Sequence, residues 1–133
     1  MQYFSVFQSL PGNKIPRCQL SPIYSELPGV ELVGVVDINQ ERAKEVAELY
    51  STTAFFDYRD LFGKVDAVSI VVPTVIHRDI AGGFIEEGIN ILIEKPVTTS
   101  LKEAKELMEM ANRNKVVLQV GHIERFNSAV VEL

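Results

Sequence analysis

Three short clusters of residues in this sequence have side chains suited to catalysis. Residues 73–77 read PTVIH, residues 94–96 read EKP, and residues 121–127 read GHIERFN. A lysine or histidine that reaches a substrate hydroxyl can exchange a proton with it, so Lys95 is a candidate for general acid–base catalysis. Each cluster also has an ordinary interpretation. A histidine near the start of a helix is commonly solvated or caps the helix, and a lysine after a strand commonly marks the return to solvent.

Apolar segments rich in β-branched residues lead into these clusters. Residues 67–72 and 89–93 are predicted strands, with a helix over residues 75–87 between them. A further strand is expected over residues 116–120, after a helix over residues 101–114. Short apolar strands joined by helices are typical of a parallel sheet that is buried on both faces. Ligands bind outside the carboxyl ends of the strands in such sheets, so we expect the three clusters to lie together there.

Capping residues mark where two of the helices begin. Ser100 and Glu103 form a capping box for the helix over residues 101–114. Asn39 is a suitable N-cap for an earlier helix, predicted over residues 40–50. These local signals agree with the apolar spacing inside both helices, which supports their assignment.

The segment upstream repeats the alternation of strands and helices. Strands are predicted over residues 31–36 and 53–56, and Asp57 is expected to cap a brief helix. The pattern from residue 31 to 120 predicts an α/β fold, a doubly wound, mostly parallel sheet of Rossmann type. Asp37 ends the first of these strands. In dinucleotide-binding folds an acid at this place holds the adenosine ribose, but Asp37 could equally serve with Asn39 to cap the helix.

Composition and charge limit the classes of function. The chain has 133 residues, enough for one domain with a sizeable core, and a formal net charge of −5. No segment gathers Lys and Arg, so neither nucleic acid nor a membrane is expected as a partner. No apolar run approaches the roughly 20 residues that a bilayer span requires, and residues 1–20 lack a secretory signal. The single cysteine, Cys18, has no partner for a disulfide or a metal site, so the sequence predicts a cytoplasmic protein without a metal.

Taken together, the three clusters resemble the Gfo/Idh/MocA family of NAD(P)-dependent oxidoreductases, which act on sugars, cyclitols and related polyols. They occur in the family's order, at the ends of the corresponding strands. The third cluster is particularly similar to the branch that acts on nucleotide-linked sugars, such as the UDP-N-acetylglucosamine 3-dehydrogenases. The resemblance covers residues 23–133. It implies a NAD(P)-binding domain that serves hydride transfer between the cofactor and a sugar or nucleotide-sugar hydroxyl.

The resemblance also implies roles for individual residues. Lys95 would be the catalytic residue, and Arg125 and Asn127 would lead toward the substrate. NAD is favoured over NADP, because Asp37 is followed by Ile38 with no adjacent arginine. The sequence leaves open whether the protein forms a homo-oligomer. The residues implied to bind the cofactor are Asp37, Arg42, Pro73, Thr74, His77, Glu94, Pro96, Gly121 and His122.

Residues 1–22 depart from the family's pattern. A glycine loop of the form GxGxxG is expected in this segment, but its three positions fall on Gly12, Lys14 and Arg17. We therefore expect the first strand and the glycine loop to be irregular or missing. Either residues 3–7 fill the centre of the sheet, or the domain is damaged there. A shifted reading frame or an altered gene start is our hypothesis for the origin of this segment.

The family's substrate domain would follow residue 133 and is absent from this sequence. The predicted organisation is therefore a non-family segment over residues 1–22 and a truncated Rossmann-like domain over residues 23–133. The isolated chain is expected to bind NAD weakly at best and to be inactive as an enzyme. Two alternatives stay open, namely a non-catalytic Rossmann-like interaction module and a non-functional gene fragment.

Overall fold

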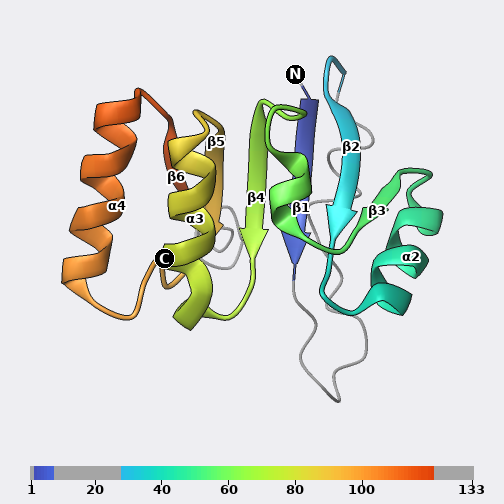
Figure 1. The fold of residues 1–133 in the computed structure, drawn as a ribbon, viewed down its shortest axis with the longest axis horizontal. Coiled ribbons are helices and arrows are strands. Elements are labelled where there is room, and N and C mark those ends of the chain that lie inside the picture. The colour runs from blue at the N-terminus through green and yellow to red at the C-terminus, as the bar shows by residue number, and fades with distance from the viewer. Residues whose placement is uncertain (1, 8–27, 122–133) are drawn as a thin grey trace, which may run out of the picture.

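One sheet of six parallel strands forms the centre of the described part of the chain (Figure 1). The computed structural model describes residues 2–7 and 28–121. The strand order is β3-β2-β1-β4-β5-β6, which is the order of a doubly wound Rossmann sheet. The predicted fold class is therefore confirmed. The strands are β1 Gln2–Phe7, β2 Glu31–Val36, β3 Thr53–Phe55, β4 Ala67–Val71, β5 Asn90–Glu94 and β6 Leu118–Gly121.

The central strand β1 is present, so the expectation that the first strand is missing is wrong. Its backbone pairs with β2 on one side and β4 on the other, with Tyr3 opposite both Leu32 and Ala67. The pairing with β2 shifts register between Tyr3 and Phe4, so this strand is irregular as predicted. Pairing on both sides gives partners to backbone groups of β2 and β4 that a gap would leave unsatisfied. Of the two alternatives, residues 3–7 filling the centre of the sheet is therefore the one that is confirmed.

Three α-helices and two 3-10 helices connect the strands in the described residues. Asn39 caps α2 as predicted, because its Oδ1 accepts the Arg42 N–H at 3.2 Å. The helix predicted over residues 75–87 begins later, since residues 74–76 form a separate 3-10 helix, η2. Asp57 caps a brief 3-10 helix, η1. The bounds are α2 Gln40–Leu49, η1 Tyr58–Leu61, η2 Thr74–Ile76, α3 His77–Glu86 and α4 Leu101–Asn114.

Apolar side chains cover both faces of the sheet. Ile70 of β4 belongs to the larger core, which packs under α3 and α4, whereas the next residue, Val71, contacts the smaller core around α2. Consecutive strand residues point to opposite faces, so β4 is buried on both sides. Phe84 and Leu107 have no exposed surface and join α3 and α4 to the larger core. The near-continuous apolar strands in the sequence reflect this two-sided burial.

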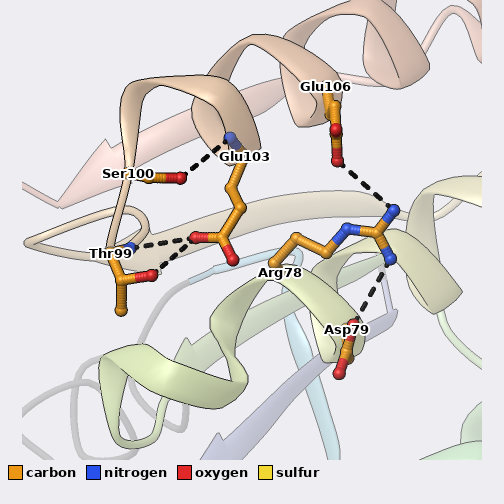
Figure 2. Close-up of polar contacts among 6 residues, drawn as sticks. All are labelled: Arg78, Asp79, Thr99, Ser100, Glu103 and Glu106. Atoms are coloured by element: carbon orange, nitrogen blue, oxygen red, sulfur yellow. Dashed lines mark hydrogen bonds and ion pairs between the residues drawn. The ribbon is translucent and has the colours of Figure 1, made fainter.

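A polar network fixes the start of α4 beside α3 (Figure 2). Ser100 Oγ accepts the Glu103 N–H at 3.3 Å, and the Glu103 carboxylate accepts the Thr99 N–H and hydroxyl at 3.2 and 2.7 Å. The Thr99 hydroxyl is the main reason that the pKa of Glu103 is lowered. Arg78 of α3 contacts Glu106 of α4 at 3.5 Å. The capping signal at residues 100 and 103 therefore marks the true start of this helix.

Replacing Ser100 with alanine is expected to lower the free energy of unfolding by about 1 kcal/mol, because the Glu103 N–H loses its acceptor. Urea denaturation followed by circular dichroism measures the change. Glu109→Ala on the exposed face of the same helix is the matched control, expected to stay within about 0.5 kcal/mol of the parent. Equal losses in both variants would contradict a capping role for Ser100.

Candidate functional site

Two of the three clusters, and the first residue of the third, lie at the carboxyl end of the sheet. The last residues of β4 and β5 are neighbours, since Ile70 pairs with Ile93. Glu94 at the end of β5 in turn pairs with Gly121 at the end of β6. The predicted meeting of these segments is therefore confirmed for the residues that the structure describes. His122, Arg125 and Asn127 lie outside the described residues, as do Gly12, Lys14 and Arg17.

His77 is buried against the loop that follows β5. The ring is 1% exposed, so the interpretation of His77 as a solvated side chain is wrong. Its Nδ1 lies 3.0 Å from the carbonyl oxygens of both Pro96 and Val97, and its Nε2 lies 2.8 Å from the Val72 carbonyl. These contacts join the first residue of α3 to the ends of β4 and β5. Pro73 and Thr74, shortly before it, are half-buried at the same end of the sheet.

Glu94, Lys95 and Pro96 form the turn that leaves β5. Glu94 is half-buried, while Lys95 and Pro96 are exposed, and the Lys95–Pro96 peptide bond is cis. The Glu94 carboxylate lies over Gly121, where an added Cβ would stand 3.1 Å from Oε1 and 3.3 Å from Cδ. A side chain at this position would require the carboxylate to move by a few tenths of an ångström. Lys95 is thus an exposed cation that directly follows the half-buried Glu94.

Asp37 and Arg42 lie on the other side of β1, separated from the Lys95 turn by two strands. Asp37 has no exposed surface, and its Oδ1 accepts the Asn39 N–H at 2.8 Å. Its own N–H donates to the Phe55 carbonyl at 3.3 Å. Arg42 is half-buried in the first turn of α2. The predicted cofactor residues therefore form two groups at one end of the sheet, an arrangement that fits an elongated ligand.

A cavity of about 340 Å³ opens at the same end of the sheet, between the segments that follow β2 and β3 and the segment from the end of β4 to α3. Its lining includes none of the catalytic or binding residues predicted from the sequence. The apolar residues of this lining could not be recognised from the sequence as site residues. Asp57 and Arg59 follow β3, so the rule that ligands bind at the carboxyl ends of strands could have identified them. The lining residues are Val36, Ile38, Phe56, Asp57, Tyr58, Arg59, Val72, Ile76, Asp79 and Ile80.

Charged side chains surround the apolar interior of this cavity. Arg59 Nη2 lies 2.7 Å from Asp57 Oδ2, and Arg59 Nε contacts both carboxylate oxygens at 2.9 and 3.1 Å. The hydrogen bonds from Arg59 hold the pKa of the Asp57 carboxyl below its ordinary value. Asp79 contributes a second, exposed carboxylate from α3. The cavity thus combines apolar walls, suited to a flat ring, with anionic acceptors for polar groups on its edge.

Residues 12–122 match the family model described as an oxidoreductase family with an NAD-binding Rossmann fold, Gfo/Idh/MocA. The chain belongs to this family. The match begins before Ile23, where the sequence placed the start of the resemblance. As a member of the Gfo/Idh/MocA family, the chain is an NAD(P)-binding Rossmann domain of the oxidoreductase type.

The chain is similar to two characterised members of the Gfo/Idh/MocA family. It is 44% identical over 100 residues to UDP-N-acetylglucosamine 3-dehydrogenase of Acidithiobacillus ferrooxidans, covering 75% of this chain and 32% of that protein. It is 36% identical over 115 residues to scyllo-inositol 2-dehydrogenase (NAD(+)) of Bacillus subtilis, covering 83% and 33%. A solved structure of the Acidithiobacillus enzyme superposes with a TM-score of 0.84 at 35% identity, over 99% of this chain and 41% of that one. The chain thus spans about a third of the length of these curated relatives.

Within residues 2–7 and 28–121, no helix is both long enough and apolar enough to cross a bilayer. In the same residues, no group of three or more His, Cys, Asp or Glu side chains is arranged to hold a metal ion.

Proposed function

We propose that this chain binds NAD(P)(H) across the carboxyl end of its sheet, as part of an oxidoreductase that acts on a hydroxyl of a sugar or nucleotide-linked sugar. The adenosine half would occupy the cavity at the ends of β2, β3 and β4, and the nicotinamide half would meet the turn of residues 94–96. The observation that carries this proposal is the pair of residue groups on either side of β1, at one end of one sheet. The substrate class is taken from the activities for which the two relatives are named.

The cavity fits the adenosine part of the cofactor. Its volume of about 340 Å³ falls within the range of small-molecule sites. Ile38 and Ile76 offer apolar surface to an aromatic ring, and Asp57 and Asp79 offer carboxylate oxygens to amino or hydroxyl groups. Asp37, at the end of β2, stands where Rossmann folds place the acid that holds the adenosine ribose. We propose on this ground that NAD is preferred to NADP.

Lys95 is the residue that we propose for catalysis. Its side chain is exposed at the carboxyl end of β5, next to the half-buried Glu94. From this position it would hold the reacting hydroxyl and exchange a proton with its oxygen as the carbinol and the carbonyl interconvert. The cofactor, when bound, supplies the hydride chemistry. A substrate domain like that of the longer relatives would have to complete the site.

Calorimetric titration of the 133-residue chain with NADH tests the binding proposal. We expect a saturable, single-site heat. Ile38→Asp should weaken binding about tenfold or more, because the bound ring would bury the new charge against an apolar surface. Leu49→Asp is the matched control, since Leu49 is 69% exposed on α2 and Ile38 is 66% exposed at the cavity. This control should leave the affinity unchanged.

Two outcomes would contradict the proposal. The absence of saturable heat with both NADH and NADPH would favour the non-catalytic interaction module. Equal loss of affinity in Ile38→Asp and Leu49→Asp would show that the cavity is not the binding site.

A further inference from the structure

Within the described part of the chain, the polar contacts of the His77 ring are with backbone carbonyl oxygens. The Pro96 and Val97 carbonyls both lie 3.0 Å from Nδ1, and the Val72 carbonyl lies 2.8 Å from Nε2. A carbonyl oxygen can only accept a hydrogen bond, so the histidine must be the donor wherever a bond forms. A proton on Nδ1 lets the ring hold the turn after β5, and a proton on Nε2 lets it hold the end of β4.

The Nδ1 contacts bear directly on the turn that carries Lys95. Pro96 and Val97 are the two residues that follow Lys95, and both present their carbonyls to the same nitrogen. His77 itself is 1% exposed, at the first position of α3, so its ring has little freedom to move. A buried donor between two acceptors fixes the path of the backbone more tightly than an exposed one.

We propose that His77 is a positioning residue that fixes the Lys95 turn, by donating its Nδ1–H to the Pro96 and Val97 carbonyls from its buried place at the start of α3. The importance of this role for the reaction rests on the proposed function, in which the turn meets the nicotinamide half of the cofactor. His77 then acts through the backbone of the turn and has no direct contact with the cofactor. This role differs from the cofactor contact that the family resemblance implies for the residue.

The other side of the turn is packed as well. Gly121 of β6 leaves space for the Glu94 carboxylate, which would meet an added Cβ at 3.1 Å. Glu94 also continues the parallel pairing with β6. The residue before Lys95 is therefore held by the sheet, and the two residues after it depend on His77. A loss of the His77 contacts should therefore change the second half of the turn most, and the test is made there.

Two substitutions separate the two ring nitrogens. The amide nitrogen of asparagine stands as many bonds from Cα as Nδ1 does, and that of glutamine as many as Nε2. His77→Asn therefore keeps a donor toward Pro96 and Val97, whereas His77→Gln keeps one toward Val72. Amide ¹⁵N relaxation of the 133-residue chain reports the order of the turn at Lys95, Val97 and Thr98. Ile91 and Ile93 inside β5 serve as internal controls.

We expect the order parameters of the turn to stay near about 0.85 in the parent and in His77→Asn, and to fall below about 0.6 in His77→Gln. The β5 controls should not change. NADH affinity should follow the same pattern, with about a tenfold loss in His77→Gln only. A turn that is equally ordered in both variants, or equally disordered in both, would overturn the proposal.

The ring ¹⁵N spectrum of the parent chain decides the question if His77→Gln does not fold. A protonated, hydrogen-bonded Nδ1 supports the proposal, and an Nδ1 without a proton overturns it. Failure of the proposed function is distinguishable from failure of this inference. If the parent chain binds no NADH, cofactor binding is refuted, while the relaxation data and the ring spectrum still decide whether His77 holds the turn.

Discussion

Replacing Phe84 with alanine is expected to lower the free energy of unfolding by about 3–5 kcal/mol. Phe84 has no exposed surface, and its ring centre lies 5.6 Å from that of Tyr58 and 5.5 Å from that of Phe62. Removal of the ring leaves a void among these aromatics that the surrounding side chains fill only in part. Since a domain of this size has a total stability of about 5–15 kcal/mol, this loss is a large share of the total. Thermal and urea denaturation measure the loss.

Phe56→Ala is the matched control for this substitution. Phe56 is 38% exposed and lines the cavity, so its removal creates no internal void. We expect a small change in stability together with weaker NADH binding. Phe84→Ala should instead reduce NADH binding only to the extent that it unfolds the chain, because Phe84 reaches the cavity through Tyr58. Similar stability losses in the two variants would mean that the aromatic cluster does not support this part of the fold.

Much of the fold follows from local patterns in the sequence. The apolar strands, the N-cap at Asn39 and the capping box at Ser100 each depend on residues close in the chain, and each is confirmed. The role of β1 could not be decided in this way. Residues 3–7 form the centre of the sheet only because β2 and β4 supply partners on both sides, and those partners come from residues far along the chain.

The candidate site likewise contains residues that could be predicted from the sequence and residues that could not. Residues with chemical side chains at strand ends, such as Glu94 and Lys95, could be placed at one end of the sheet from the order of the strands and helices alone. The cavity could not, because Ile38 and Ile76 are ordinary apolar residues that acquire a role from the elements around them. His77 shows the limit most clearly. Its ring contacts carbonyls 19 and 20 positions further along the chain, so its burial cannot be inferred from its own neighbourhood.

Asp37→Asn is expected to lower the ratio of the NADPH to the NADH dissociation constant about tenfold or more, equivalent to about 1.4 kcal/mol. The substitution removes the negative charge that would repel a 2′-phosphate and would accept hydrogen bonds from the ribose hydroxyls. It keeps an amide oxygen that can accept the Asn39 N–H, which Asp37 Oδ1 now accepts at 2.8 Å. The folded structure should therefore be preserved. Paired calorimetric titrations with NADH and NADPH measure the ratio.

Asp37→Ala separates the structural role of this carboxylate from its role in cofactor choice. The alanine variant loses the acceptor for the Asn39 N–H at the start of α2, so the free energy of unfolding should fall by about 1–3 kcal/mol. Asp37 has no exposed surface, which is the observation that favours a purely structural role. If Asp37→Asn leaves the NADPH to NADH ratio unchanged while Asp37→Ala destabilises the chain, Asp37 caps the helix and does not select the cofactor. A shifted ratio in a stable Asp37→Asn chain would instead assign Asp37 to the ribose, since that variant keeps an acceptor for the Asn39 N–H and lacks the negative charge.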